Sequence, residues 1–143
     1  MIYNLTKKSV VARRPVSAIT FLSRGRGMIG RDFTDLDALV FQNCASIHTF
    51  FMRINIDVLF LDRENVIRGL RENLRPWCPL VRCDDAVSVI ELPAGAASRS
   101  ACELGDTLDL NAELTEAEKR KLANGKLLMP TPETVLPIRE VTK

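Results

Sequence analysis

The sequence predicts a mainly β fold, a β-sandwich or jelly-roll-like small barrel with two or three short helices. Many short segments show the period-two alternation of apolar residues that is typical of strands, and turn residues separate these segments. The longest such segment covers residues 47–62, where every even position from Phe50 to Phe60 is apolar. Helical spacing or helix-capping residues occur in only a few short stretches.

The composition bounds the class of protein. The 143 residues are 46% hydrophobic, which suffices for one domain with a real core. The net charge of +2 argues against a dedicated nucleic-acid binder, because such proteins usually carry a strong excess of basic residues. The four cysteines are few and irregularly spaced, so free thiols in a reducing compartment are expected, although a pairing of Cys78 with Cys83 stays open.

The chain shows no targeting or membrane-spanning pattern. Its first residues contain no apolar stretch of signal-peptide length, and no run approaches the roughly 20 apolar residues of a membrane span. We therefore expect a cytoplasmic protein without a membrane span. Export by a route that needs no such signal stays open.

Before the central run, two strands and one helix are predicted. Residues 10–12 and residues 38–41 are short apolar runs, and we expect a strand in each. Between them, apolar residues recur at helical spacing from Val16 to Leu22, with a proline before and two glycines after. This pattern predicts a short helix over about residues 16–24.

The central run is too long for one strand, which would span roughly 50 Å. Strands in small domains are usually about 5–6 residues long, so the chain should bend near residues 53–55. One strand is then expected over about residues 47–52 and another over about residues 56–61. Asn65 marks a turn into residues 66–71, which predicts a hairpin with the second strand.

The elements after this hairpin follow from turn residues and short apolar runs. Two prolines three positions apart exclude regular strand pairing and predict a loop. The predicted segments in chain order are the loop at 75–79, a strand at 87–92, one or two helical turns within 96–102, and a strand at 107–110.

The character of the chain changes after residue 111. Thr115 and Glu118 have the spacing of a capping box, and an Asn-Gly pair at 124–125 would end the helix that they begin. Three of the seven prolines lie beyond this helix. We therefore predict a single β domain over residues 1–111 and a charged, proline-containing tail over residues 112–143 with one short helix.

Several segments between residues 24 and 110 together resemble the domain-of-unknown-function 192 family, also called uncharacterised protein family 0127. The matching segments are 26–31 (RGMIGR), 39–41 (LVF), 47–52 (IHTFFM), 56–62 (IDVLFLD), 89–95 (VIELPAG) and 105–108 (GDTL). The chain departs from the family pattern at Asn55, where proline is frequent, at Asn65, where glycine is frequent, and at Ser100-Ala101, where a leucine-glycine pair is usual.

The resemblance implies a compact, mostly β fold of sandwich or jelly-roll type over a core of residues 24–110. It implies no reaction, because the family has no established activity, and fold alone supplies none. It also implies a link to cell-envelope or secretion machinery, with which such domains are sometimes associated.

Polar and aromatic residues around the predicted bend form the leading candidate ligand site. They are His48, Arg53, Asp57, Asp62 and Trp77. Polar groups and one aromatic side chain at the end of a sandwich are typical of a pocket for a small polar ligand. The structural alternative, which is the stronger one, is that the two aspartates bound turns and that Arg53 pairs with one of them.

A second, weaker candidate is an anion site at Arg24, Arg26 and Arg31. Glycines between these arginines would let the backbone approach an anion, and guanidinium groups bind phosphate through paired hydrogen bonds. The lysine of the phosphate-binding loop is absent, so a flexible, exposed loop is the favoured alternative.

Catalytic and metal sites have little support in the sequence. A nucleophilic Cys78 would need His48 within hydrogen-bond reach, and nothing in the spacing places them together. Cys78 and Cys83 lack the paired spacing of a zinc site, so no catalytic residue, metal or cofactor is predicted. We expect a non-enzymatic β module that binds a small polar ligand or a protein partner. The alternative is a small cysteine- or carboxylate-dependent hydrolase.

Overall fold

The computed structural model describes residues 1–19, 27–113, 115–117 and 120. Contacts within the chain divide it into two compact units, residues 1–113 and residues 114–143. In the second unit Glu116, Ala117 and Arg120 are helical, and the remainder of the predicted tail helix lies outside the described residues. None of the helices in the described part of the chain is long and apolar enough to cross a membrane.

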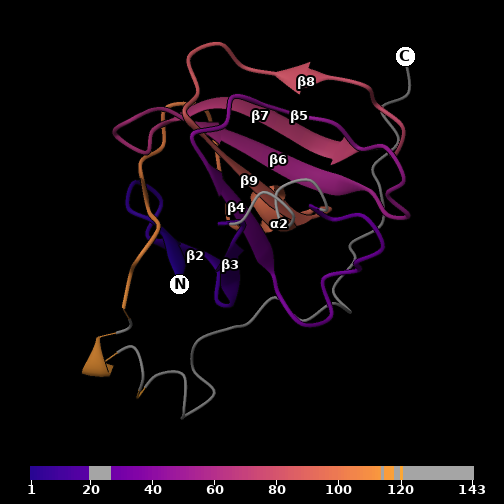
Figure 1. The fold of residues 1–143 in the computed structure, drawn as a ribbon. Coiled ribbons are helices and arrows are strands. Elements are labelled where there is room, and N and C mark those ends of the chain that lie inside the picture. The colour runs from indigo at the N-terminus through magenta and orange to yellow at the C-terminus, as the bar shows by residue number, and fades with distance from the viewer. Residues whose placement is uncertain (20–26, 114, 118–119, 121–143) are drawn as a thin grey trace, which may run out of the picture. The chain divides into compact units, whose positions relative to one another are not determined.

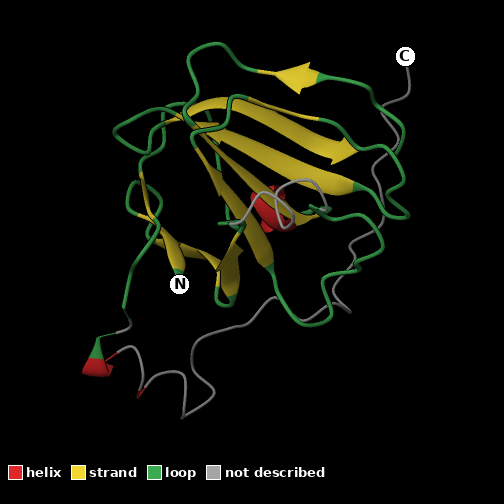
Figure 2. Cartoon of the chain, viewed as in Figure 1, coloured by secondary structure: helices red, strands yellow, loops and turns green. Residues whose placement is uncertain are grey.

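A five-stranded sheet in the spatial order β3-β4-β9-β6-β7 forms the centre of the first unit (Figure 1 and Figure 2). Its strands are β3 (Pro15–Ser17), β4 (Ala38–Gln42), β6 (Ile56–Leu61), β7 (Ile67–Leu74) and β9 (Ser88–Pro93). β3 runs parallel to β4, and the other neighbouring strands run antiparallel. All six residues of β6 are buried, because β6 has a strand on each side and apolar side chains on both faces.

Two smaller sheets and a short helix complete this unit. One sheet has the order β10-β1-β2, and the other pairs β5 with β8 in antiparallel fashion. These elements are β1 (Ile2–Asn4), β2 (Ser9–Ala12), β5 (Ser46–Ile47), β8 (Val81–Arg82), α2 (Ala96–Arg99) and β10 (Leu108–Asp109). The helix α2 packs against β6 and β9 and begins after Gly95, whose φ of 83° suits glycine.

Apolar side chains pack on both faces of the central sheet. Successive residues of a strand point to opposite faces, so Leu59 and Leu61 of β6 join one cluster, whereas Val58 and Phe60 join the other. The first cluster also contains Ile2, Val11, Ala97 and Leu108 from the three-stranded sheet and α2. The second cluster also contains Met28, Leu36 and Met52 from the loops.

The mainly β class is confirmed, and so is the predicted hairpin, which lies at one edge of the central sheet. β6 lies where it is predicted and pairs antiparallel with β7. In the turn between them, Asn65 adopts a φ of 58°, in the left-handed region that asparagine tolerates. The strands that the structure describes form separate sheets and do not close into a barrel.

The predicted helix over residues 16–24 is wrong in its described part. Val16 belongs to β3, and Ala18 continues the ladder by donating its N–H to the Val40 carbonyl at 2.9 Å. Ile19 is 84% exposed, so the apolar spacing marks no buried helical face. A β-branched residue beside an available strand edge forms sheet hydrogen bonds instead.

The strand predicted over residues 47–52 is shorter than expected. β5 ends at Ile47, and the chain then leaves the sheet because the backbone and hydroxyl of Thr49 bond to the loop after β7. The bend predicted at residues 53–55 is confirmed, since β6 begins only at Ile56.

One glutamate side chain is buried at the centre of the five-stranded sheet. Glu91 of β9 lies between Leu39 of β4 and Val58 of β6, and it is 2% exposed. Its Oε2 atom has no hydrogen-bond partner in the described structure. Burial raises the pKa of Glu91 from 4.5 to about 8, because a charged carboxylate is disfavoured away from water. The folded protein therefore holds this carboxyl mostly protonated at neutral pH.

This buried carboxyl makes stability depend on pH. The folded state binds the Glu91 proton more tightly than the unfolded state does. This proton binding therefore contributes its full share to the free energy of unfolding below pH 4.5. We expect the free energy of unfolding to fall as the pH rises toward about 8, by about 1.4 kcal/mol per pH unit. Glu91→Gln should remove this part of the slope. Urea denaturation at a series of pH values measures how the free energy of unfolding changes with pH in the wild-type protein and in the variant. Equal slopes in the two proteins would contradict a raised pKa of Glu91.

Candidate functional site

Four aromatic side chains from two loops meet at one end of the central sheet. His48, Phe50 and Phe51 lie in the loop before β6, and Trp77 lies in the loop after β7. The start of β6 pairs with the end of β7, so both loops leave the sheet at the same end. Ring centroids are 5.4 Å apart for His48 and Phe50, 6.1 Å for Phe50 and Trp77, and 4.9 Å for Phe51 and Trp77. We call these four residues the aromatic cluster.

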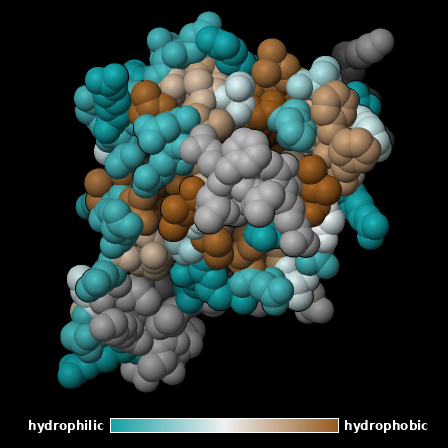
Figure 3. Space-filling view, viewed as in Figure 1, coloured by the Kyte–Doolittle hydropathy of each residue, from teal (hydrophilic) through white to brown (hydrophobic). Residues whose placement is uncertain are grey.

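The aromatic cluster stands out on the molecular surface. On the face seen in Figure 3, apolar residues that reach the surface are interspersed with hydrophilic ones. Among the described residues, seven large apolar side chains are exposed, and three of them, Phe51, Trp77 and Leu80, come from these two loops. Phe51 is 62% exposed and Trp77 is 59% exposed. Most of the area of these two rings is therefore free for contact with another molecule.

Buried Thr49 joins the two loops beneath the cluster. Its N–H donates to the Cys78 carbonyl at 2.9 Å, and its carbonyl accepts the N–H of Trp77 at 2.9 Å. Its hydroxyl donates to the Arg75 carbonyl at 2.8 Å and accepts the N–H of Cys78 at 2.8 Å. Thr49 is fully buried, so water does not compete for these bonds. The backbone that carries Trp77 is therefore fixed to the backbone beside Phe50.

Two members of the cluster have strained backbones. Phe51 has a φ of 61° and Trp77 a φ of 68°, in the left-handed region that bulky side chains rarely adopt. Such conformations cost on the order of 1–3 kcal/mol each, persist only where the surroundings enforce them, and concentrate at functional sites. Here the Thr49 hydrogen bonds enforce the conformation at Trp77, and the strain coincides with two exposed rings of the cluster.

The structure places Asp57 inside the protein rather than at a surface. Its Oδ1 accepts the N–H of Asn73 at 2.9 Å, and its Oδ2 accepts the N–H of Ala97 at 2.9 Å. It thereby links β6 to β7 and to α2, and it is fully buried. Arg53 is exposed, and among the described residues it forms no ion pair with Asp57. Two backbone amides hold Asp57 in place of the arginine considered from the sequence.

Asp62 lies at the other end of β6. Its Oδ1 accepts the N–H groups of Glu64 and Val66, and Arg68 Nε donates to Oδ2 at 2.6 Å. Partial burial would raise the pKa of Asp62, but the bonds from Val66, Arg68 and Glu64 together outweigh burial and hold that pKa below its usual value. Asp57 and Asp62 are five positions apart on an extended strand, or roughly 17 Å.

Of the predicted ligand site, the structure brings together His48 and Trp77. Asp57 is buried beneath the sheet end and Asp62 lies at the opposite end of β6, so neither joins these two rings. The ligand-binding role of the five residues stays a prediction. Sequence reasoning missed Phe50 and Phe51 as candidates. The available signal was Phe51 itself, an aromatic residue at an odd position of a run whose neighbouring odd positions are polar.

The hydrolase alternative finds no support in this region. His48 Nδ1 accepts the N–H of Phe50 at 3.3 Å, and the backbone of Cys78 is bonded to Thr49. In the described part of the chain no hydrogen bond joins the Cys78 thiol to His48, and all four cysteines are free.

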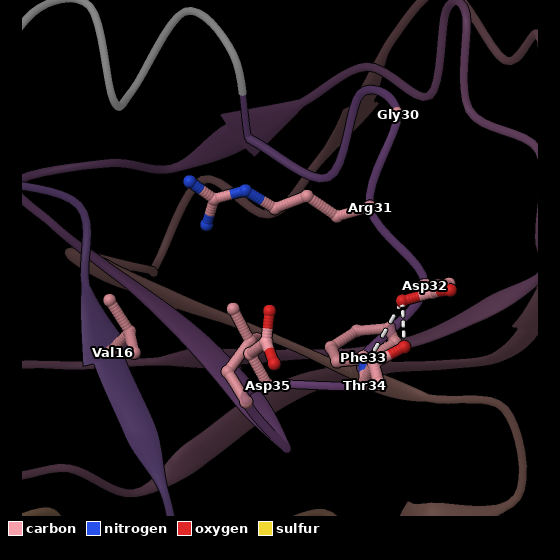
Figure 4. A pocket seen from close by; sticks show the side chains of 8 residues that line it. Val16, Gly30, Arg31, Asp32, Phe33, Thr34 and Asp35 are labelled. Atoms are coloured by element: carbon pink, nitrogen blue, oxygen red, sulfur yellow. Dashed lines mark hydrogen bonds between the residues drawn. The ribbon is translucent and has the colours of Figure 1, made fainter.

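A second feature is a cavity of about 440 Å³ beside β3 (Figure 4). It is lined by Val16 and by the loop residues Gly30, Arg31, Asp32, Phe33, Thr34, Asp35 and Leu36. Of the predicted anion site, Arg31 lines this cavity, whereas Arg24 and Arg26 lie outside the described residues. We call it the loop cavity.

Comparison with known proteins places the chain among relatives without an assigned function. The DUF192 family, described as "Uncharacterized ACR", matches residues 5–110. A UPF0127 protein from Thermococcus sibiricus is 37% identical in an alignment 119 residues long, which covers 79% of this chain and 76% of that protein. A UPF0127 protein from Pyrococcus abyssi is 42% identical over 65 residues, which are 46% of this chain and 55% of that protein.

Two solved structures share the fold. One is a protein of unknown function from Novosphingobium aromaticivorans, with a TM-score of 0.59 and 19% identity, over 66% of this chain and 73% of that chain. The other, from Sinorhizobium meliloti, is named as a candidate transcription regulator, with a TM-score of 0.60 and 22% identity, over 66% of this chain and 79% of that chain. At these identities the likeness concerns the fold alone, so the function has to be argued from the surface of this chain.

The hydrogen bonds of the Thr49 hydroxyl should stabilise the protein measurably. In Thr49→Val the Arg75 carbonyl and the Cys78 N–H lose their buried partner, so the protein should be destabilised by about 1–3 kcal/mol. Trp77 fluorescence should change at the same time, because its loop is no longer held. Urea denaturation and emission spectra measure both effects. Thr107→Val is the control, because the Thr107 hydroxyl makes no hydrogen bond with the described residues. If both variants are equally stable, the hydrogen bonds of Thr49 do not hold the two loops together.

Proposed function

This chain belongs to the DUF192 family, and we propose that it is a non-catalytic binding module that docks on a protein partner through the aromatic cluster. The observation that carries the proposal is the exposed pair of Phe51 and Trp77, whose rings meet at 63° with centroids 4.9 Å apart. Tryptophan is among the residues that most often dominate the energy of protein interfaces. Because Thr49 already fixes the loops, binding would lose little conformational entropy.

The surroundings of the cluster favour an acidic partner segment. Arg53 and Arg75 are exposed, and they lie two positions from Phe51 and Trp77 respectively. Leu80, which is 64% exposed, adds apolar area in the same loop as Trp77. The complementary surface is a peptide segment with an apolar or aromatic anchor and flanking carboxylates, because opposite charges around an apolar contact raise association rates and specificity.

A protein partner fits this surface better than a small polar ligand. Sites for small polar ligands need several convergent polar groups that fix the ligand's orientation. Asp57 is buried with both carboxylate oxygens occupied, and Asp62 lies at the other end of β6. The steep angle between Phe51 and Trp77 also offers no single flat face on which a planar ligand would stack.

Selection from a random-peptide display library tests the proposal. The full chain should enrich peptides that contain acidic residues around an apolar anchor, and the enriched peptides should change the fluorescence of Trp77. Trp77 is the only tryptophan of the chain, so this signal reports on the cluster directly. A stabilising small metabolite in a thermal-shift panel, or an oligonucleotide that binds at the cluster while no peptide does, would replace the protein-partner proposal with another class of partner.

Three alanine variants separate the cluster from apolar surface in general. Phe51→Ala and Trp77→Ala should each weaken binding of a selected peptide by at least about 30-fold, the loss expected for the anchor of an interface. Leu104→Ala is the matched control, because Leu104 is 65% exposed and lies beside the start of β7, far from the loop that follows it. Calorimetric titration measures all three. Equal loss in the control, or no loss in the other two, would rule out the cluster as the contact surface.

A further inference from the structure

Two oppositely charged side chains, those of Arg31 and Asp35, line the loop cavity. Figure 4 shows the side chain of Arg31 extending across the cavity, with the carboxylate of Asp35 below it in this view. Among the described residues, no ion pair or side-chain hydrogen bond involves either group. Two opposite charges that flank an open space, and are not already bonded, are available to a ligand that carries the complementary pair.

A third charged side chain that lines the cavity, Asp32, is already hydrogen-bonded within the loop. Asp32 accepts hydrogen bonds from the hydroxyl and the N–H of Thr34, and these bonds hold the pKa of Asp32 below its usual value. Asp32 is therefore ionised at neutral pH, but its carboxylate bonds to Thr34 of the same loop. With Arg31 and Asp35, the cavity carries one positive and two negative side chains. This balance disfavours a simple anion such as phosphate.

Part of the cavity lining is apolar. Val16 and Phe33 line it, and Leu36 is buried behind it in the second core cluster. Cavities of roughly 300–1,000 Å³ hold small molecules, and a volume of about 440 Å³ lies at the small end of that range. Charged and apolar side chains in one cavity call for a ligand that carries both charges and hydrocarbon.

The loop around the cavity is held in shape. Both oxygens of Asp37 accept backbone N–H groups, from Arg13 and Arg14, each at 2.7 Å. These bonds tie the end of the loop to the segment before β3. Phe33 has a φ of 62°, a strained conformation for an aromatic residue of the kind found at ligand sites.

We infer that the loop cavity binds a small zwitterion with an apolar side chain, the chemical class of a free α-amino acid. The ligand's carboxylate would bond to the guanidinium of Arg31, which presents paired donors, and its ammonium group would bond to the carboxylate of Asp35. Its side chain would lie against Val16 and Phe33. This site is separate from the aromatic cluster, and it replaces the anion predicted at Arg31 with a ligand of balanced charge.

Titration of the full, isotope-labelled chain with matched probes tests the inference. The probes are a panel of the common amino acids, with leucine compared against 4-methylpentanoate, which lacks the ammonium group, 3-methylbutylamine, which lacks the carboxylate, and inorganic phosphate. At least one apolar amino acid should shift the backbone amide resonances of residues 30–36 in a saturable way. The two singly charged analogues should bind at least about tenfold more weakly.

Charge variants provide the second arm of the test. Arg31→Gln and Asp35→Asn should each weaken binding of the amino acid by about tenfold or more. The control Asp84→Asn removes an exposed ion pair with Arg82 elsewhere and should leave the affinity unchanged. The absence of a saturable shift with every amino acid would overturn the inference. Phosphate or 4-methylpentanoate binding as tightly as leucine, and more tightly after Asp35→Asn, would overturn it in favour of an anion site.

Discussion

The hydrogen bonds of buried Thr49 are the constraint on which the exposed surface of this protein depends. The central sheet brings the loop before β6 and the loop after β7 to the same end, but strand pairing alone leaves both loops free to move. Thr49 joins them through backbone and hydroxyl together, and no water reaches these bonds. As a result, Phe51 and Trp77 are displayed in conformations that free loops would rarely adopt. Exposed rings on a fixed backbone are the physical basis of the proposed binding surface.

Two acidic side chains within the same sheet illustrate the opposite solutions to burial. Both oxygens of Asp57 accept backbone N–H groups, which replace the water that this carboxylate has lost. Glu91 lies between Leu39 and Val58, its Oε2 finds no such donor among the described residues, and burial raises the pKa of Glu91 to about 8. Asp57 therefore fixes β7 and α2 to β6, whereas Glu91 makes the core sensitive to pH. The two residues point to opposite faces of the sheet, so each apolar cluster lies on the same face as one of them.

The sequence predicts the parts of the fold that local pattern determines. Strand β6 and its hairpin follow from alternation and from Asn65, which tolerates a positive φ. The helix expected at 16–24 is wrong in its described part, because the edge strand β3 pairs with β4, and residues 20–24 lie outside the described residues. The spacing of residues in one segment does not reveal which strand edge is available to it. Likewise, β5 stops at Ile47 because Thr49 finds partners roughly 30 positions later in the chain. Such long-range competition for hydrogen bonds has no signature in a single sequence.

The candidate site was predictable to a similar degree. His48 and Trp77 are recognisable as unusual residues, and the structure explains their proximity through the pairing of β6 with β7. The surroundings of the aspartates were not predictable, because strand alternation indicates which face a side chain lies on but not which group it bonds to. Backbone amides, and not Arg53, bond to Asp57. The charges of the loop cavity lie in a segment with no periodic pattern, so only their arrangement in space shows that Arg31 and Asp35 line one cavity.

Time-resolved fluorescence anisotropy of Trp77 tests the central claim most directly, since this residue is the only tryptophan. A surface side chain on a free loop reorients within picoseconds to nanoseconds, faster than a domain tumbles. If Thr49 fixes the loop and Phe51 holds the indole, the anisotropy should decay almost entirely with the tumbling of the protein, although the ring is 59% exposed. A dominant fast component would contradict the claim that the aromatic cluster is a preformed binding surface.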